Sequence, residues 1–381
     1  MYISRIALKN WRNFRNVDVK LSDRVFIVGP NASGKSNFLD ALRFLRDLAK
    51  PGGGLEKAVS DRGGLIKIRC LAARSRPNIE LDLDISGFNS SEPVWRYSLG
   101  LKSVAKTAYL THEKVWNRGT LILNRPDKED NSDSARKTQT HLEQINANYT
   151  FRDIADFFAT FHYIHLIPQL LRQPSNFTFS PVSGDDPFGI NFLYQVLNTN
   201  KKTRDSRLKK INNALKAAVP QFTDLTITQE TVSGRPHLEA IYEHWRERGA
   251  RQREDQFSDG TLRLIALLWA VMDGDSPLFL EEPELSLNRG IVRRIPQLIH
   301  KIQSLQKIRR QFIISTHSAD LLSDKSIGPE ETLLLEPSNE GTKIIAAADR
   351  EDIVAMLDGG MRMGEAVMPL TEPHSEQLSF L

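Results

Sequence analysis

The sequence contains a single cysteine, Cys70, in 381 residues, which excludes a disulfide framework and is typical of the reducing cytoplasm. Residues 1–5 lack the apolar core of a secretion signal. The longest apolar stretch, residues 262–272, is interrupted by Arg263 and is too short to span a bilayer. These absences predict a cytoplasmic protein without membrane association.

Neither sign of charge dominates, because 51 Lys and Arg residues face 47 Asp and Glu residues, a net charge of +4. This mild excess permits nucleic-acid binding, but scattered solubilising charge explains it equally well. The chain has no internal repeat. Its 40% of hydrophobic residues can bury a sizeable core, and its length suits two domains or one large domain with an insertion.

The two ends of the chain carry the pattern of one α/β core. Residues 3–8 alternate and residues 24–28 form a short apolar run, so both are predicted strands. Residues 37–48 have apolar side chains at helical spacing, and the glycine-rich residues 51–54 end that helix. Near the other end, apolar residues 278–280 and 311–315 predict two buried strands, with a helix over 291–305 between them.

The middle of the chain is predicted to be inserted into this core. Residues 65–125 are β-rich, the polar residues 127–140 predict a mobile loop, and residues 191–219 predict helices. The remaining predictions are strands at 65–71, 79–85, 95–101, 120–124 and 161–167, helices at 151–158 and 261–272, and a hairpin from 225–231 and 237–242.

The predicted strand over residues 24–28 runs directly into a phosphate-loop pattern, in which four residues separate two glycines and the second glycine is followed by lysine and serine. The glycines let successive N–H groups point at phosphate oxygens, and the following helix adds its positive end. Lys35 reaches the β- and γ-phosphates, and Ser36 offers its hydroxyl to Mg²⁺. ATP and Mg²⁺ are therefore the predicted ligands, bound by Gly29, Pro30, Asn31, Ala32, Ser33, Gly34, Lys35, Ser36 and Asn37.

A buried strand over residues 278–280 ends in the carboxylates Glu281 and Glu282. Ligands of open α/β sheets bind at the carboxyl ends of the strands. Glu281 is the predicted magnesium-side carboxylate, and Glu282 the catalytic one that orients or deprotonates the attacking water. Acidic strand ends are also common on ordinary surfaces, so the prediction depends on the phosphate loop. A second strand ends at His317, which could bind the γ-phosphate, although a lone histidine there is more often structural.

These residues together resemble ABC-type ATPases of the SMC, RecF and OLD class, in the small AAA branch found in bacterial defence and repair loci. The resemblance identifies residues 256–261 as the ABC signature, Glu281 and Glu282 as Walker B, residues 286–288 as the D-loop and His317 as the switch histidine. It implies that Arg12 lies near the nucleotide, and that Gln169 is the Q-loop glutamine, which contacts nucleotide and metal. Glu281 departs from the usual aspartate, and Asn288-Arg289 from the usual His-Pro.

The resemblance also implies a mechanism and a fold. Ser258 and Gly260 of one subunit would cap the ATP in the phosphate loop of another, so ATP joins a homodimer or higher oligomer and hydrolysis releases it. The implied fold is a P-loop ABC-type ATPase head with an inserted helical and β subdomain and no long coiled coil. The predicted parts are two ATPase lobes at 1–169 and 256–370, an inserted subdomain at 170–255 and a flexible tail at 371–381.

Within this class we expect the sensor ATPase of an anti-phage defence complex, because only about 60 residues follow His317 and no nuclease module is expected there. By analogy it would control a separate TOPRIM-like or HNH effector. A RecF-like repair or replication accessory ATPase is the alternative, and an ABC transporter head fits poorly with the long insert.

Two further partners are suggested by local composition. Basic residues could form a DNA surface, although a solvated helix face explains them equally well. These are Lys201, Lys202, Arg204, Lys209, Lys210, Arg246, Arg248, Arg251 and Arg253. Residues 376–381 resemble peptides that bind the bacterial sliding clamp, while a disordered or self-docking end is the simpler interpretation.

Overall fold

The computed structural model describes residues 1–74, 78–90, 92–172, 186–216, 219–243, 249–306 and 309–372. It divides into two compact units. The first consists of Met1–Tyr163, Ser276–Phe279 and Arg309–Leu381, and the second of Ile164–Asp275 and Leu280–Ile308. The predicted division into lobes at 1–169, 170–255 and 256–370 stays a prediction. The tail residues 373–381, with the clamp-like peptide, and Arg246 and Arg248 lie outside the described residues.

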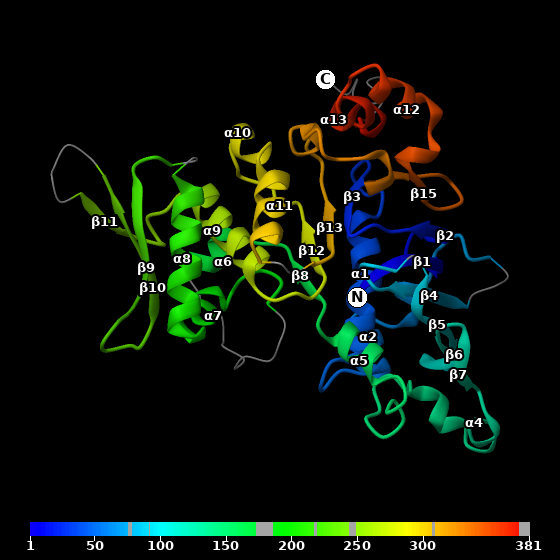
Figure 1. The fold of residues 1–381 in the computed structure, drawn as a ribbon. Coiled ribbons are helices and arrows are strands. Elements are labelled where there is room, and N and C mark those ends of the chain that lie inside the picture. The colour runs from blue at the N-terminus through cyan, green and yellow to red at the C-terminus, as the bar shows by residue number, and fades with distance from the viewer. Residues whose placement is uncertain are drawn as a thin grey trace, which may run out of the picture. The chain divides into compact units, whose positions relative to one another are not determined.

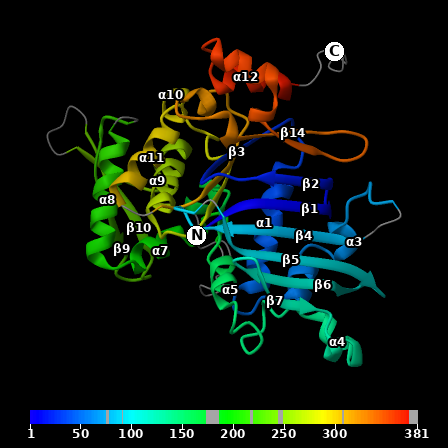
Figure 2. The same ribbon diagram turned by 45° about the vertical axis from the view of Figure 1, so that its right-hand side comes forward.

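The first unit contains an antiparallel sheet in the order β2-β1-β4-β5-β6-β7 (Figure 2). Its strands are β1 (Tyr2–Trp11), β2 (Phe14–Lys20), β4 (Ile79–Ser86), β5 (Pro93–Val104), β6 (Thr107–Asn117) and β7 (Thr120–Arg125). The predicted strand over 65–71 was wrong, because α2 (Leu55–Ser60) and α3 (Leu65–Ile68) occupy that region. Gly64 precedes α3 at φ 94°, a left-handed backbone that starts a new turn.

A second sheet carries the order β15-β14-β3-β13-β12-β8. Its strands are β3 (Arg24–Val28), β8 (His162–Ile164), β12 (Leu278–Glu281), β13 (Phe312–Ser315), β14 (Thr332–Glu336) and β15 (Lys343–Ala346). Both β13 and β14 run parallel to β3. The strands β3 and β13 are apolar and almost fully buried, as expected for parallel strands covered on both faces. The predicted core strands at 24–28, 278–280 and 311–315 are confirmed.

Gln311 joins the two sheets of the first unit from a fully buried position. Its side-chain oxygen accepts the N–H of Ile3 at 2.9 Å, and its amide donates to the carbonyl of Ile3 at 2.8 Å. Because a buried amide left unpaired costs free energy, this reciprocal pair fixes β1 against the start of β13. The antiparallel sheet thereby holds the strand that leads to His317.

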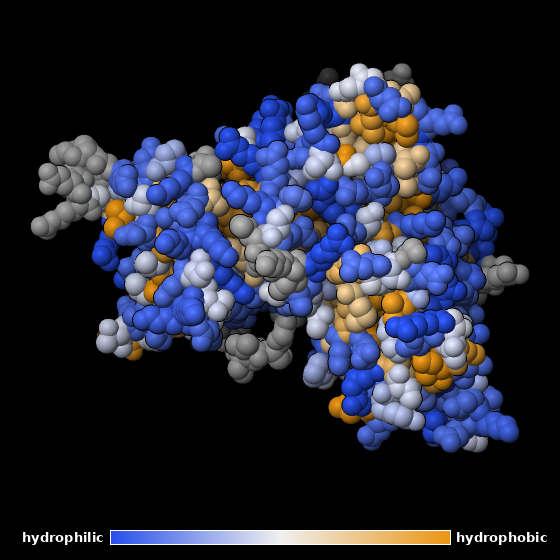
Figure 3. Space-filling view, in the orientation of Figure 1, coloured by the Kyte–Doolittle hydropathy of each residue, from blue (hydrophilic) through white to orange (hydrophobic). Residues whose placement is uncertain are grey.

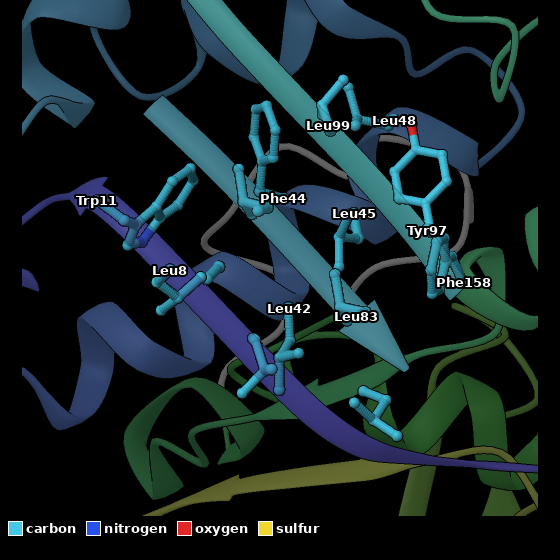
Figure 4. Packing of buried hydrophobic residues seen from close by; sticks show 14 of the residues in the cluster. Leu8, Trp11, Leu42, Phe44, Leu45, Leu48, Leu83, Tyr97, Leu99 and Phe158 are labelled. Carbon is cyan, nitrogen blue, oxygen red and sulfur yellow. The ribbon is translucent and has the colours of Figure 1, made fainter. Parts of the chain in front are cut away.

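The helix α1 (Lys35–Ala49) fills the core of the first unit (Figure 4). Its apolar side chains Leu42, Phe44, Leu45 and Leu48 lie against β1, β4 and β5. The Trp11 and Phe44 rings lie 5.2 Å apart, and the Trp11 indole donates to the Asn37 carbonyl at 3.0 Å. The sheet therefore orients the first turn of this helix as well as burying its face.

Residues 127–140 are not the loop without regular structure that their polar composition predicted. They form α4 (Lys128–Ser132) and the 3₁₀ helix η1 (Ser134–Thr138) around Arg125, which is 1% exposed. Arg125 donates to Glu113 at 2.9 Å and to Asp130 at 2.7 Å, and both carboxylates are fully buried. The hydrogen bond that Arg125 donates to Asp130 lowers the pKa of this carboxyl group. Composition alone shows the charges but not that they meet in the interior.

The second unit places helices beside a small antiparallel sheet in the order β11-β10-β9 (Figure 1). Its strands are β9 (Phe222–Gln229), β10 (Pro236–Tyr242) and β11 (Ala250–Arg253), and the first two form the predicted hairpin. The predicted helix over 291–305 is interrupted after residue 292. The helices are α6 (Pro168–Arg172), α7 (Phe192–Asn198), α8 (Lys201–Leu215), α9 (Asp259–Met272), α10 (Arg289–Val292) and α11 (Ile295–Gln306).

After β13, the first unit also contains several short helices. They are η3 (Leu321–Ser323), η4 (Pro329–Glu331), η5 (Ala347–Asp349), α12 (Glu351–Asp358), α13 (Met363–Val367) and η6 (Met368–Thr371). Figure 3 shows apolar surface over α12 and α13, where Met356, Met361 and Leu370 are exposed. Within the described ranges, no helix has the length and apolar character needed to cross a bilayer.

Replacing Arg125 by Met should lower the free energy of unfolding by about 3–5 kcal/mol, because Glu113 would remain buried without its cation and Asp130 would keep only the longer contact with Arg136, at 3.4 Å. Urea unfolding followed by circular dichroism measures this change. Arg15→Met is the matched control, since Arg15 pairs with Glu340 on the surface and should contribute about 0–1 kcal/mol. Equal destabilisation by the two variants would contradict the account.

Candidate nucleotide-binding site

The phosphate loop lies between β3 and α1 in the first unit, and left-handed backbone gives it its curve. Ala32 and Gly34 have φ values of 61° and 104°. A Cβ atom on Gly34 would lie 2.2 Å from the Asn13 amide nitrogen, and one on Gly29 would lie 2.7 Å from the Ser33 hydroxyl oxygen. Both glycines are therefore required by space, and such concave backbone turns N–H groups toward an anion.

The ammonium of Lys35 is held inside this loop, with the residue 6% exposed. It donates to the carbonyls of Gly29 at 2.9 Å and Pro30 at 3.0 Å. The hydroxyl of Ser33 is buried and has no hydrogen-bond partner among the described residues. A buried hydroxyl normally has a partner, so this one is a donor suited to a ligand oxygen. The loop therefore combines a buried cation, a hydroxyl donor without a protein partner, and close backbone approaches that only glycine allows. These features fit a bound polyphosphate.

Asn13 is the contact that sequence reasoning missed. Its amide donates to the Ser33 carbonyl at 2.6 Å and to the Thr342 hydroxyl at 2.7 Å. Its side-chain oxygen accepts from the Asn37 amide at 2.9 Å. Asn13 thus braces both the phosphate loop and the first turn of α1. The sequence offered only the position of Asn13 next to Arg12 as a signal for this role, because Asn13 and Ser33 are 20 residues apart.

Arg12 lies beside Asn13 but contacts α1 rather than the loop. It donates to the Asp40 carboxylate at 3.1 Å and to the Lys67 carbonyl at 3.3 Å. Asp40 also pairs with Arg62 at 2.9 Å. A role for Arg12 at the nucleotide stays a prediction.

His317 follows β13, which pairs in register with β3 so that Ser315 lies opposite Ile27. The N–H of Thr316 donates to the Ile27 carbonyl at 3.1 Å. Because Gly29 and His317 each follow these paired residues by two positions, both leave the sheet at the same edge. His317 is half-buried there. The strand pairing therefore brings the predicted switch histidine to the edge that carries the phosphate loop.

The predicted signature residues lie at the start of α9 in the second unit. Ser258 is the exposed N-cap, and its hydroxyl accepts the N–H of Thr261 at 3.1 Å. The side chain of Asp259 is held by two residues of α6, Arg172 at 2.5 Å and Gln169 at 3.0 Å. Gln169 thus faces the signature in this structure, and its role toward nucleotide or metal stays a prediction.

The predicted Walker B carboxylates lie at the end of β12, also in the second unit. Glu281 is the last residue of the strand, and Glu282 has a φ of 44°, which is uncommon for a residue other than glycine. The guanidinium of Arg263, on α9, donates to the Glu282 carbonyl at 3.3 Å. Burial lowers the pKa of Arg263, while the nearby carboxylates of Glu284, Asp259 and Glu282 oppose that shift.

The structure thus groups the predicted site into two halves. The phosphate loop, Arg12 and His317 belong to the first unit, and Gln169, Ser258, Gly260, Glu281 and Glu282 to the second. No cluster of three or more His, Cys, Asp or Glu side chains placed to hold a metal is present in the described parts of the chain.

A family model described as "AAA domain, putative AbiEii toxin, Type IV TA system" matches residues 24–324. Endonuclease GajA of Bacillus cereus (strain VD045) is 23% identical over 347 residues, which are 84% of this chain and 56% of that protein. The DNA replication and repair protein RecF of Chloroflexus aggregans is 42% identical over 52 residues, 13% of each chain. The chain therefore spans about half of the length of GajA and a small part of RecF.

Solved structures of similar fold are SMC heads. An SMC head bound to the C-winged helix domain of ScpA superposes with a TM-score of 0.53 at 15% identity, covering 91% of this chain and 97% of that one. A Pyrococcus furiosus head, bound to the C-terminal domain of ScpA, gives 0.50 at 14% identity, covering 94% and 99%. The predicted fold, a P-loop ATPase head of this class, is confirmed, and no long coiled coil is present in the described residues.

Replacing Asn13 by Ala should weaken ATP binding roughly 5- to 20-fold, because two hydrogen bonds that shape the loop are lost. Equilibrium binding of a fluorescent ATP analogue measures the dissociation constant. Asn16→Ala makes the same chemical change at an exposed position of β2 and should leave the constant unchanged. Wild-type affinity in Asn13→Ala would show that the brace is dispensable.

Proposed function

The chain belongs to the AAA-domain family whose model it matches, and within that family we propose that it is an ATP-hydrolysing switch that closes two copies around nucleotide. Its ATPase-family membership is shared with the SMC, RecF and GajA proteins. The observation that carries the proposal is the built phosphate loop, with Lys35 buried at its centre and Asn13 as its brace. Hydrolysis, magnesium dependence and dimerisation are the proposed steps.

ATP binding would exchange the contacts of Lys35. Its ammonium would leave the carbonyls of Gly29 and Pro30 for the β- and γ-phosphate oxygens, while the loop N–H groups and Ser33 hold the remaining oxygens. Ser36 and Glu281 would hold the magnesium ion, which neutralises charge on the phosphates. Glu282 would accept the proton of the attacking water, and His317 would position the γ-phosphate.

A second copy would complete the site through its signature segment. Ser258 is exposed at the N-terminus of the 14-residue helix α9, where N–H groups and the helix dipole favour an anion. By analogy with ABC-type heads, this end would contact the γ-phosphate that the partner binds. ATP would then bind the closed dimer better than the open one, and its hydrolysis would reverse that preference.

We propose a sensor role in bacterial anti-phage defence, acting with a separate TOPRIM-like or HNH effector. GajA, named an endonuclease, supports the nuclease link because its similarity runs along 84% of this chain. The RecF-like alternative is supported by a shorter match, over 52 residues. Co-purification of the full chain from its native host tests this choice: a nuclease-type partner supports the first role, and replication proteins alone support the second.

Glu282→Gln should hydrolyse ATP at least about 100-fold more slowly, because the group that accepts the proton of the attacking water is lost. The variant should retain ATP binding and accumulate an ATP-dependent dimer. Phosphate release and sedimentation velocity measure the two properties. Lys35→Ala should show neither binding nor dimer, and Glu351→Gln, on the exposed start of α12, should behave as wild type. Wild-type hydrolysis by Glu282→Gln would refute its catalytic role.

Duplex DNA is the proposed ligand of α8. Lys201, Lys202, Lys209 and Lys210 are exposed and have no ion-pair partner in the described part of the chain. By contrast, Arg207 pairs with Asp273 at 2.7 Å, and Arg251 and Arg253 pair with Glu239. The face of α8 visible in Figure 3 is hydrophilic. The four lysines are therefore the cations most available to phosphates.

Changing these four lysines to Gln should weaken duplex binding in the presence of ATP and reduce the slope of log K against log salt by up to about 3–4, since each phosphate contact contributes about 0.9. Fluorescence anisotropy at two or more salt concentrations measures the slope. The matched control changes Lys20, Lys102, Lys106 and Lys128, which are exposed on the first unit. If both variants give the same slope of log K against log salt, the lysines of α8 form a solvated helix face and do not bind DNA.

A further inference from the structure

The signature segment and the Glu282 turn are in close contact within the second unit. A Cβ atom on Gly260 would lie 2.6 Å from the carbonyl oxygen of Ser286, so the start of α9 touches the backbone that follows Walker B. Both Glu282 and Ser286 have left-handed φ values, 44° and 62°. Strained residues persist only where the surroundings hold them, and the start of α9 is one part of those surroundings.

Arg263 makes the second contact between these segments. It lies three residues after Gly260 on α9, is 5% exposed, and donates to the Glu282 carbonyl at 3.3 Å. Its Nε–H is buried without a hydrogen-bond partner among the described residues. Burial lowers the pKa of Arg263, and the neighbouring carboxylates of Glu284, Asp259 and Glu282 oppose that shift. A buried cation in an otherwise apolar helix is costly, and the hydrogen bond that Arg263 donates goes to the turn that carries Glu282.

We propose that Arg263 is a positioning residue that couples the signature segment to Glu282 of the same chain. Because α9 is a continuous helix, a shift of Ser258 and Gly260 on meeting the partner's nucleotide would move Arg263 and the Glu282 carbonyl with it. Nucleotide bound in one site would thereby change the position of the turn that carries Glu282 in the other site. This inference rests on the proposed ATP-bound dimer, and it makes the two sites reciprocal.

Arg263→Met should lower kcat about 10- to 100-fold, while the dissociation constant for ATP stays within about twofold, because Arg263 acts on the turn and not on the nucleotide. The Hill coefficient of hydrolysis should fall toward 1. Arg263→Lys should recover part of kcat, since a cation returns. Arg310→Met is the matched control: Arg310 is also a buried arginine that donates to a backbone carbonyl, that of Ser276, and kcat should not change.

A mixed dimer separates coupling from simple support of the turn. In this dimer one chain carries Lys35→Ala, so its own phosphate loop holds no ATP, and the signature of the second chain has no nucleotide to contact. The second chain is either wild type or Arg263→Met, and only its phosphate loop hydrolyses ATP. If Arg263 transmits the occupancy of the opposite site, the two pairings should hydrolyse ATP at equal rates. A further loss in the Arg263→Met pairing would overturn the coupling, as would unchanged kcat and Hill coefficient in the Arg263→Met homodimer.

Failure of the proposed function would look different from failure of this inference. If the wild-type chain neither hydrolyses ATP nor forms an ATP-dependent dimer, the proposed function itself is wrong. If wild type does both with a Hill coefficient above 1 and Arg263→Met does the same, only the coupling is wrong. Where Arg263→Met does not fold, as judged by circular dichroism, Arg263→Lys and Arg263→Gln carry the same comparison.

Discussion

The buried ammonium of Lys35 is the constraint on which the proposed site depends. A cation with 6% exposure needs close acceptors, and the carbonyls of Gly29 and Pro30 provide them at 2.9 and 3.0 Å. The loop that carries these carbonyls turns through left-handed backbone at Ala32 and Gly34. Asn13 then fixes that curve from outside, through the Ser33 carbonyl and Asn37. The antiparallel sheet, to which Asn13 is joined, thus acts on the loop directly.

A second buried cation lies among the residues of the second unit that belong to the proposed site. Arg263 and Gly260 tie the start of α9 to the turn that carries Glu282, whereas Gln169 and Arg172 hold Asp259 from α6. The start of α9, which carries the signature, therefore contacts the Glu282 turn on one side and α6 on the other. In the proposed dimer, this segment would meet the partner's nucleotide and also contact the turn that carries Glu282, which would provide a short physical route between the two active sites.

The sequence predicted the parts of this protein that follow from local periodicity and chemistry. The strands at 24–28 and 311–315, the helix after the phosphate loop and the carboxylates at the end of β12 all depend on runs of apolar residues and their ends. The strand predicted at 65–71 was wrong, because apolar residues alternate there although the glycines at 63 and 64 start a helical turn. Asn13, Arg125 and Arg263 were missed as contacts because their partners are distant in sequence or depend on burial.

The central claim is that each ATP site is built from two copies of the chain, and complementation tests it most directly. Lys35→Ala destroys the phosphate loop, and Ser258→Arg blocks the signature, so neither variant alone should hydrolyse ATP. Their mixed dimer retains one intact phosphate loop facing one intact signature, and the account predicts that mixing restores hydrolysis. Folded variants that stay inactive when mixed, or hydrolysis by Ser258→Arg alone at the wild-type rate, would contradict a site shared between copies.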